Sequence, residues 1–337
     1  MRSFASDNWS GVHPVVLDAL INANVGHHAA YGSDDYTKYA QELFKSIFGK
    51  DSSTYFVYNG TAANIMALES VSHSFNSVIC SEHAHIHVDE CGAMEKHAGV
   101  KLISLPTTNG KLSPEQILPH IKTERYPHQS EPSVISITQA TELGTVYSLD
   151  EIKKLADLAH EYGLYLHIDG ARISNAVVAL NTDFKSMITD TGVDILSFGG
   201  TKTGMMFGEA VVFLKPELDK YFELYRKQGM QLASKMRFIS AQFIALLSKD
   251  VWKENATNAN NMAKYLADKL SAIPEIKISQ EVQSNGVWAI IPQPLAEKMQ
   301  KAQFFYPWDE KKSEYRIMAS WDTTKQEIDQ FISLIKQ

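Results

Sequence analysis

The sequence predicts an α/β protein whose main feature is a mostly parallel sheet of seven strands, with helices on both faces. Two observations carry this prediction. Short apolar and β-branched runs alternate with segments of helical composition up to about Pro216. Several of those helical segments also begin with recognisable capping signals. Strands that alternate with helices form βαβ units, and such units build a parallel sheet covered on both sides.

The predicted strands are apolar runs that stop at turn residues, at 53–60, 77–81, 101–105, 133–138, 164–171, 193–200 and 209–214. Helical composition follows four of them, at 61–71, 87–99, 112–121 and 148–163. Ser113 and Gln116 form a capping box with proline between them, and Ser148 and Glu151 form a second one. Gly163 occupies the position of a helix C-cap glycine.

A second, smaller region follows the strand–helix alternation. Helical segments run to about Ser271, two strand-like stretches lie at 286–293 and 315–321, and an amphipathic helix ends at Gln337. We therefore expect a large domain at 16–245 and a small α+β domain at 246–337. Residues 1–15 are expected to form an arm that contributes to the active site, and residues 309–314 a solvated loop.

Composition excludes several classes of function. The chain has 337 residues, 44% of them hydrophobic, and a net charge of −7, which argues against nucleic acid or an anionic membrane as a partner. Two cysteines do not make a disulfide framework, which favours the reducing cytoplasm. We see no secretory signal at the N-terminus and no run of about 20 apolar residues.

Three predicted strand ends carry residues of distinct chemistry. A Gly60–Thr61 turn opens a helix and offers backbone amides to a phosphate, although it also fits an ordinary N-cap. Asp169 follows an apolar run and needs a partner, which could be Arg172 in a structural ion pair. Lys202 stands between small residues in "SFGGTKTG", where an ordinary surface lysine is also an option.

These three strand ends meet at one edge of a parallel sheet, so they favour a single ligand. That ligand would carry a phosphate, a ring nitrogen that keeps its proton beside a carboxylate, and an aldehyde that reacts with an amine. Pyridoxal 5′-phosphate has all three groups. The glycines and threonines around Lys202 would let cofactor and substrate approach its nitrogen.

The segment "HAHIH" supports a rival hypothesis. His83, His85 and His87 alternate, and on a strand they would share a face with metal-ligand spacing, as in a metal-dependent hydrolase. That hypothesis leaves Lys202 without a role, so we expect no metal and treat His83 and His87 as helix caps near the surface. A non-catalytic binding protein on the same scaffold is a third option, which the full set of lysine, aspartate and arginines disfavours.

The chain resembles the low-specificity L-threonine aldolases, which belong to the fold-type I pyridoxal phosphate enzymes. The resemblance runs nearly end to end, over "FASDNWSGVHP", "YGSDD", "NGTAANIMAL", "CSEHAHIHVDECGA", "HIDGARISNA", "SFGGTKTG", "QLASKMRF" and "YRIMASWDT". It implies cleavage of L-threonine, L-allo-threonine and related β-hydroxy-α-amino acids to glycine and an aldehyde. The alternatives within this class are a β-eliminating lyase and a serine hydroxymethyl-type activity.

The resemblance also implies roles for single residues. Lys202 would bind the cofactor aldehyde, Asp169 its pyridine nitrogen, and His85 would stack on its ring. The remaining cofactor contacts would come from Gly60, Thr61, Ala62, Arg172 and Arg237. The substrate contacts would come from Ser6, Tyr31, Arg172, Lys227 and Arg316. Of these, Ser6, Arg172 and Arg316 would surround the substrate carboxylate. Lys227 and Arg237 would come from a neighbouring subunit of a dimer or tetramer.

The chain departs from the family pattern after the fourth strand. Many members carry "ENTHN" there, with the histidine near the substrate hydroxyl, whereas this chain reads "TQATELG". Thr141 and Glu142 stand in that place. The acceptor of the hydroxyl proton is therefore open between His85, Glu142 and a water held by them or by Thr141.

Overall fold

The computed structural model describes residues 3–121 and 126–335. Seven strands form the larger of two sheets: β1 (Ser53–Val57), β2 (Asn76–Ser81), β3 (Lys101–Leu105), β4 (Glu131–Thr138), β5 (Tyr165–Gly170), β6 (Ile195–Gly199) and β7 (Glu209–Phe213). Their order is β1-β7-β6-β5-β4-β2-β3. Strand β7 is antiparallel to both of its neighbours, and the pairs from β6 to β3 are parallel. This is the predicted fold class.

Side chains that alternate along the strands of the large sheet enter two separate hydrophobic clusters. On β6, Leu196 and Phe198 belong to one cluster and Ile195 to the other; on β7, Val212 and Val211 divide in the same way. Because successive side chains of a strand point to opposite faces, the two clusters lie on opposite faces of the sheet. Each face is covered by helices, as the sequence predicts.

The first face is covered by α2 (Asp35–Phe48), α7 (Leu149–Glu161), α8 (Ile173–Ala179) and α10 (Arg237–Ser248). The second face is covered mainly by α3 (Gly60–Ser70) and α9 (Phe222–Gln228). Shorter or peripheral helices are α1 (Pro14–Ala23), α4 (His85–Val88), α5 (Ala93–His97) and α6 (Pro114–Ile117). We call the large sheet with these helices the large lobe.

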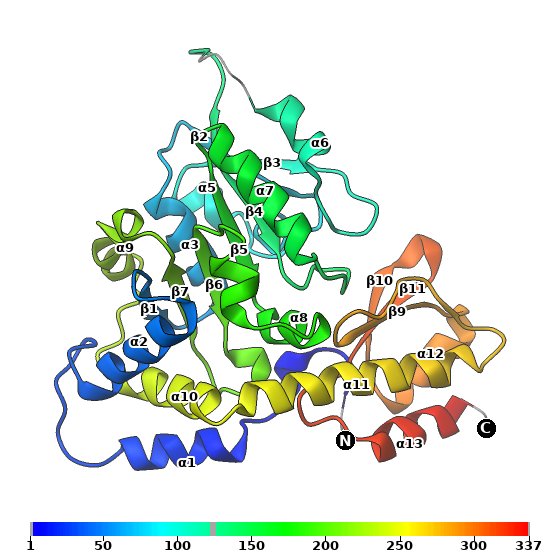
Figure 1. The fold of residues 1–337 in the computed structure, drawn as a ribbon. Coiled ribbons are helices and arrows are strands. Elements are labelled where there is room, and N and C mark those ends of the chain that lie inside the picture. Colours follow the sequence, from blue (N-terminus) through cyan, green and yellow to red (C-terminus); the bar gives the residue numbers. More distant parts are fainter. Residues whose placement is uncertain (1–2, 122–125, 336–337) are drawn as a thin grey trace.

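A small lobe is built on a four-stranded antiparallel sheet in the order β10-β11-β9-β8. Its strands are β8 (Lys277–Ile278), β9 (Gly286–Ile290), β10 (Tyr306–Asp309) and β11 (Glu314–Met318), and its helices are α12 (Gln293–Ala302) and α13 (Lys325–Ile335). The long helix α11 (Val251–Ser271) packs against α8 of the large lobe and β9 of the small lobe, and so joins the two (Figure 1).

The capping signals in the sequence are found in the structure. The Ser148 hydroxyl accepts a hydrogen bond from the Glu151 amide at the start of α7, and the Glu151 carboxylate accepts one from the Ser148 amide. At α6, the Gln116 side chain accepts from the Ser113 amide at 3.0 Å. Gly163 follows α7 with a φ of +70°. These local patterns therefore place helix ends correctly.

Other features of the small lobe differ from the sequence prediction. Strands β8 and β10 are additional, and the expected loop at 309–314 is a short 3-10 turn between the ends of β10 and β11. The last helix is described to Ile335, and residues 336–337, like residues 1–2 of the expected arm, lie outside the described residues. The domain boundaries at 15 and 245 stay a prediction. No helix within 3–121 and 126–335 is long and apolar enough to cross a membrane.

The two lobes meet where Trp288 of β9 packs against the loop after β4. A Cβ atom built on Gly144 would lie 2.4 Å from the indole ring, and Gly144 has a φ of +74°. The Gly144 carbonyl also accepts from the Ser284 hydroxyl at 2.9 Å. Only glycine allows the loop and the indole to approach this closely.

We predict that Gly144→Ala lowers the free energy of unfolding more than Gly163→Ala does. Both glycines have a positive φ, but a Cβ on Gly163 would meet nothing within 4 Å. The control should therefore lose about 1 kcal/mol through backbone strain alone. The Gly144 variant should lose a further ~1–3 kcal/mol through overlap with the indole. Urea denaturation measures both, and equal losses would contradict the proposed contact.

Candidate active site

The carboxyl ends of β4, β5 and β6 converge on a cavity of about 180 Å³ between the lobes. Seven residues singled out from the sequence line it: Ser6, His85, Thr141, Glu142, Arg172, Lys202 and Arg316. They come from the N-terminal arm, from the loops after four strands, and from β11 of the small lobe. The fold thus gathers an amine, two guanidinium groups, an imidazole and a carboxyl group in one small space.

Lys202 lies in a 3-10 turn that directly follows β6. Burial lowers the pKa of its ammonium group, and the positive charge of Arg172 lowers it further. A lysine whose pKa is lowered has a larger share of the neutral amine, which is the form that reacts with an aldehyde. This position is therefore suited to a nucleophilic amine.

Asp169 lies at the end of β5, next to a small hollow that Gly60 and Asn64 also line. Its carboxylate accepts from the Asn64 amide group at 2.8 Å and from the Ala171 backbone at 2.9 Å. The structural ion pair between Asp169 and Arg172, left open by the sequence, is not the pairing that the structure has, because Arg172 binds Asp7 instead.

The N-terminus of α3 faces the same hollow. The Asn59 side chain caps this eleven-residue helix by accepting from the Ala62 amide at 2.9 Å. Amides of the first helical turn have no partner inside the helix, and Ala62 already uses its own. Of the three residues predicted to bind the phosphate, Gly60 and Thr61 therefore still have a backbone amide to offer. A Cβ on Gly60 would meet nothing within 4 Å, so the space beside it is open.

A buried ion pair fixes Arg172. Its Nε and Nη2 atoms donate to the Asp7 carboxylate at 2.8 and 2.9 Å, and the Asn285 amide group donates to the same carboxylate at 2.9 Å. Burial raises the pKa of Asp7, but Arg172 outweighs burial and brings the pKa down to about 2. The carboxylate is therefore ionised, and it orients the guanidinium group at one end of the cavity.

Arg316 lies at the other side of this end, on β11. Its guanidinium group is 5.9 Å from the Tyr306 ring centre and 5.5 Å from that of Trp308. Burial lowers its pKa, and the positive charge of Arg172 lowers it further. Among the described residues, its buried Nε atom has no hydrogen-bond partner. Two guanidinium groups that destabilise each other form a site for an anion.

His85 is linked to Asp169 through two buried side chains. Its Nδ1 atom lies 2.8 Å from the Glu90 carboxylate, and the Asn64 amide group donates to Glu90 at 3.0 Å and to Asp169 at 2.8 Å. The hydrogen bond to Glu90 raises the pKa of His85, with burial opposing it. The network fixes the imidazole ring through Nδ1, so Nε2 is the ring nitrogen that can exchange a proton with a ligand.

Glu142 provides a second group that can move a proton. One carboxylate oxygen accepts from the His85 backbone at 2.9 Å and from the Thr138 hydroxyl at 2.7 Å. The other, Oε2, is buried and without a partner in the described part of the chain. Burial raises the pKa of Glu142 to about 7. Thr141 shares a hydrogen bond with the Thr145 hydroxyl at 2.7 Å, which fixes the loop beside it.

Three residues implied by the family resemblance lie away from this cavity. Lys227 places its ammonium group 5.2 Å from the Tyr31 ring centre, and Arg237 donates to the backbone of Ala23 at 3.1 Å. Neither these residues nor Tyr31 line the cavity in a single chain.

Sequence reasoning missed the residues that support the site. Asp7 and Glu90 both stand inside motifs quoted above, but nothing in the sequence identifies Arg172 and His85 as their partners. Trp288 and Trp308 of the small lobe also line the cavity, and their strand positions alone do not reveal it. The metal hypothesis for "HAHIH" needs a strand, whereas His85 and His87 lie in the helix α4.

We predict that Glu90→Gln lowers the pKa of His85, because the hydrogen bond to the Glu90 carboxylate is the main cause of its increase. NMR titration of histidine-labelled protein without cofactor measures this pKa. Glu95→Gln, a change on the exposed side of α5, is the matched control and should leave it unaltered. An unchanged pKa in the Glu90 variant would show that the network does not control the imidazole.

Comparisons with known proteins agree with this geometry. The model of the β-eliminating lyase family matches residues 3–291. Low specificity L-threonine aldolases from Pseudomonas aeruginosa and Pseudomonas sp. strain NCIMB 10558 are 41% and 42% identical to the chain, each over 96% of it and 93% of the relative. The structure of a Leishmania major threonine aldolase superposes with a TM-score of 0.94 at 28% identity, covering 100% of this chain and 99% of the other. The chain therefore belongs to the β-eliminating lyase family and groups with its low specificity L-threonine aldolases.

Proposed function

We propose that the protein uses pyridoxal 5′-phosphate to cleave L-threonine, L-allo-threonine and related β-hydroxy-α-amino acids to glycine and an aldehyde. The observation that carries this proposal is the single cavity that combines Lys202, a pair of arginines, and the proton-moving groups His85 and Glu142. The activity named for the relatives of this chain supports it.

The residues present suit the cofactor. Lys202 offers an amine of lowered pKa, Asp169 offers a carboxylate held by two donors, and the first turn of α3 offers amides for a phosphate. When bound, the cofactor supplies an aldehyde for the substrate amine and a ring that accepts the electron pair of the broken Cα–Cβ bond. Asp169 would keep the ring nitrogen protonated, and His85 would cover the ring.

Arg316 and Ser6 are proposed to bind the substrate carboxylate, with Arg172 beside them. Two nitrogens of Arg172 already bind Asp7, so its remaining Nη1 atom is the one that can reach a ligand. Arg316 has its Nε atom without a partner within the described residues, so it would be the main contact. Holding the carboxylate at this end fixes the direction of the Cα–Cβ bond.

His85 is proposed to accept the proton of the substrate hydroxyl at Nε2. When Nδ1 donates to the ionised Glu90, the lone pair of Nε2 is free, and the raised pKa of the ring makes it a better base near neutral pH. Glu142 would orient a water or the hydroxyl through its unpartnered Oε2. This assignment replaces the second histidine that many relatives carry.

A homo-oligomer in the cytoplasm completes the proposal. The side chains of Leu17 and Ile21 on α1 are exposed. Val25, just after α1, and Met230, three residues after Lys227, are exposed as well. Apolar surface of this kind is typical of an interface between subunits. Such an interface would bring Lys227 and Arg237 to a neighbouring site, in a dimer or tetramer. The described chain has two free cysteines, Cys80 and Cys91, which suits a reducing compartment.

The first test concerns Lys202. We expect the purified protein to be yellow, borohydride to fix the cofactor covalently to Lys202, and Lys202→Ala to prevent this. Peptide mass spectrometry identifies the modified residue. With threonine the products should be glycine and acetaldehyde; release of ammonia and 2-oxobutanoate instead would indicate β-elimination. A colourless protein that gains no activity with added cofactor would contradict the proposal.

The second test separates His85 from Glu142. The rate of threonine cleavage by His85→Asn, assayed with saturating cofactor, should be lower by about 10²–10⁴-fold, as is typical for a lost acid–base group. Glu142→Gln should lose less. Because Glu142 has a pKa of about 7 and acts when ionised, its replacement should also flatten the rise of activity with pH near neutrality. Near-normal cleavage by His85→Asn, with a large loss in Glu142→Gln, would assign the base to the carboxylate.

A further inference from the structure

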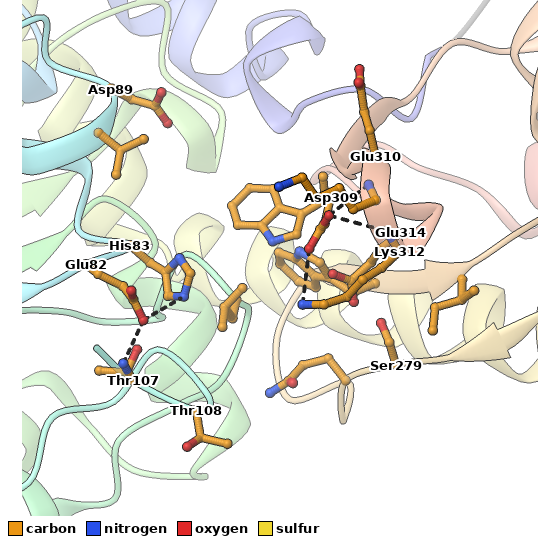
Figure 2. A pocket seen from close by; sticks show the side chains of 17 residues that line it. Glu82, His83, Asp89, Thr107, Thr108, Ser279, Asp309, Glu310, Lys312 and Glu314 are labelled. Atoms are coloured by element: carbon orange, nitrogen blue, oxygen red, sulfur yellow. Dashed lines mark hydrogen bonds and ion pairs between the residues drawn. The ribbon is translucent and has the colours of Figure 1, made fainter. Parts of the chain in front are cut away.

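A groove of about 1050 Å³ lies between the two lobes and adjoins the catalytic cavity. Figure 2 shows its walls: Glu82, His83 and Thr107 of the large lobe face Asp309 and Lys312 of the small lobe. Asp89, Trp288 and Trp308 line both the groove and the cavity. These three shared side chains form the boundary between the two spaces, so a molecule longer than the cavity would extend past them into the groove.

The cavity itself suits only a small substrate. Its volume of about 180 Å³ must hold the amino acid and the reacting groups, whereas the groove is several times larger. Arg172, which lines the cavity, is fixed by its ion pair with the buried Asp7. A long substituent on the β-carbon exceeds this cavity, and the groove beyond the shared residues Asp89, Trp288 and Trp308 is adjoining space that can take it.

The small sheet sets the direction from the arginine to the groove. Arg316 and Trp288 are register partners on β11 and β9, so their side chains share one face of this sheet. Trp308 lies 5.5 Å from the Arg316 guanidinium group and packs edge-on against Trp288 at 5.9 Å. Arg316, which is proposed to bind the substrate carboxylate, therefore lies on the same face of the small sheet as Trp288. The indole rings of Trp288 and Trp308 lie between Arg316 and the rest of the groove.

The groove is acidic. Its lining includes five carboxylate side chains and two lysines, an excess of three negative charges when His83 is neutral: Glu82, Asp89, Asp309, Glu310 and Glu314 against Lys311 and Lys312. Lys312 lies 3.1 Å from the Asp309 carboxylate, which neutralises both locally. The remaining excess favours a cationic group in the groove and disfavours an anionic one.

We propose that this groove is a subsite for the β-substituent of long β-hydroxy-α-amino acids, and that its acidic lining selects neutral and cationic substituents over anionic ones. The proposal depends on the proposed aldol cleavage for the orientation of the substrate. Threonine, whose methyl group ends inside the cavity, would not sense the groove.

Three matched substrates test the charge selection. Each is a 2-amino-3-hydroxy acid whose β-carbon carries the same unbranched four-carbon chain, ended by an ammonium, a hydroxyl or a carboxylate group. The remote end group leaves the reacting bond electronically unchanged. At low salt we expect kcat/KM to be higher for the ammonium than for the carboxylate substrate by on the order of tenfold, with the hydroxyl substrate between them. In 1 M salt, where the screening length is about 3 Å, the ratio should approach one.

Two pairs of substitutions locate the effect. The double variant Glu310→Gln/Glu314→Gln removes two charges that line the groove but not the cavity, and it should lower the ratio several-fold while kcat/KM for threonine stays unchanged. The double variant Glu275→Gln/Glu297→Gln removes two exposed small-lobe charges outside the groove and should leave the ratio as it was. The proposal would be overturned if the ratio of kcat/KM values were the same in both double variants and the unmutated protein, or if it were one at low salt.

A binding measurement separates this proposal from the reaction itself. Amino acids with the same three end groups but no β-hydroxyl are titrated into the holoenzyme, and binding is followed by the fluorescence of the tryptophans beside the groove. The same ranking in Kd would support the subsite even if threonine were not cleaved. Threonine cleavage without any ranking in kcat/KM or Kd would exclude the subsite and leave the proposed reaction intact.

Discussion

The ion pair between Asp7 and Arg172 is the contact on which the arrangement of the site depends. A buried guanidinium group without a partner costs several kcal/mol, so Arg172 at the end of β5 requires a carboxylate, and the N-terminal arm supplies it. The same carboxylate binds Asn285 of the small lobe. One buried charge thus joins the arm, the large lobe and the small lobe at the wall of the cavity. A backbone hydrogen bond of 2.8 Å from the Met318 amide to the Phe4 carbonyl also ties the arm to the end of β11.

The carboxyl groups around this cavity have very different environments, and therefore different protonation. Asp7 lies against a guanidinium group and has a pKa of about 2, whereas Glu142 is buried, forms no ion pair within the described residues and has a pKa of about 7. Burial likewise raises the pKa of Glu90, which lies between His85 and Asn64. One site can thus contain a permanent anion that orients an arginine and a second carboxyl group that exchanges its proton near neutral pH. The fold achieves this division by its choice of partners, since both residues are simple carboxylic acids.

Local patterns made the large lobe predictable. The seven strands, the capping boxes at Ser113 and Ser148, and the common edge that holds Asp169 and Lys202 all follow from short stretches of sequence and from the geometry of parallel sheets. The pairing of Arg172 with Asp7 could not be predicted, because Asp169 was an equally good partner on charge alone and only the folded arm decides. Strands β8 and β10 were also missed, since β8 has two residues and β10 has only four, one of them a proline and one an aspartate. The roles of the site residues remain predictions that rest on chemistry and on the family pattern.

The distribution of the cavity walls along the chain has a consequence for biosynthesis. The large sheet is complete once β7 has been made, and domains generally fold as they emerge, with the N-terminal part first. The segment with Ser284, Asn285 and Trp288, and then Arg316, is made only afterwards. Until then the chain lacks the small-lobe side chains that line the cavity together with Lys202. Because burial is the main cause of the lowered pKa of Lys202, this lysine acquires its full shift only when the small lobe has closed the cavity around it.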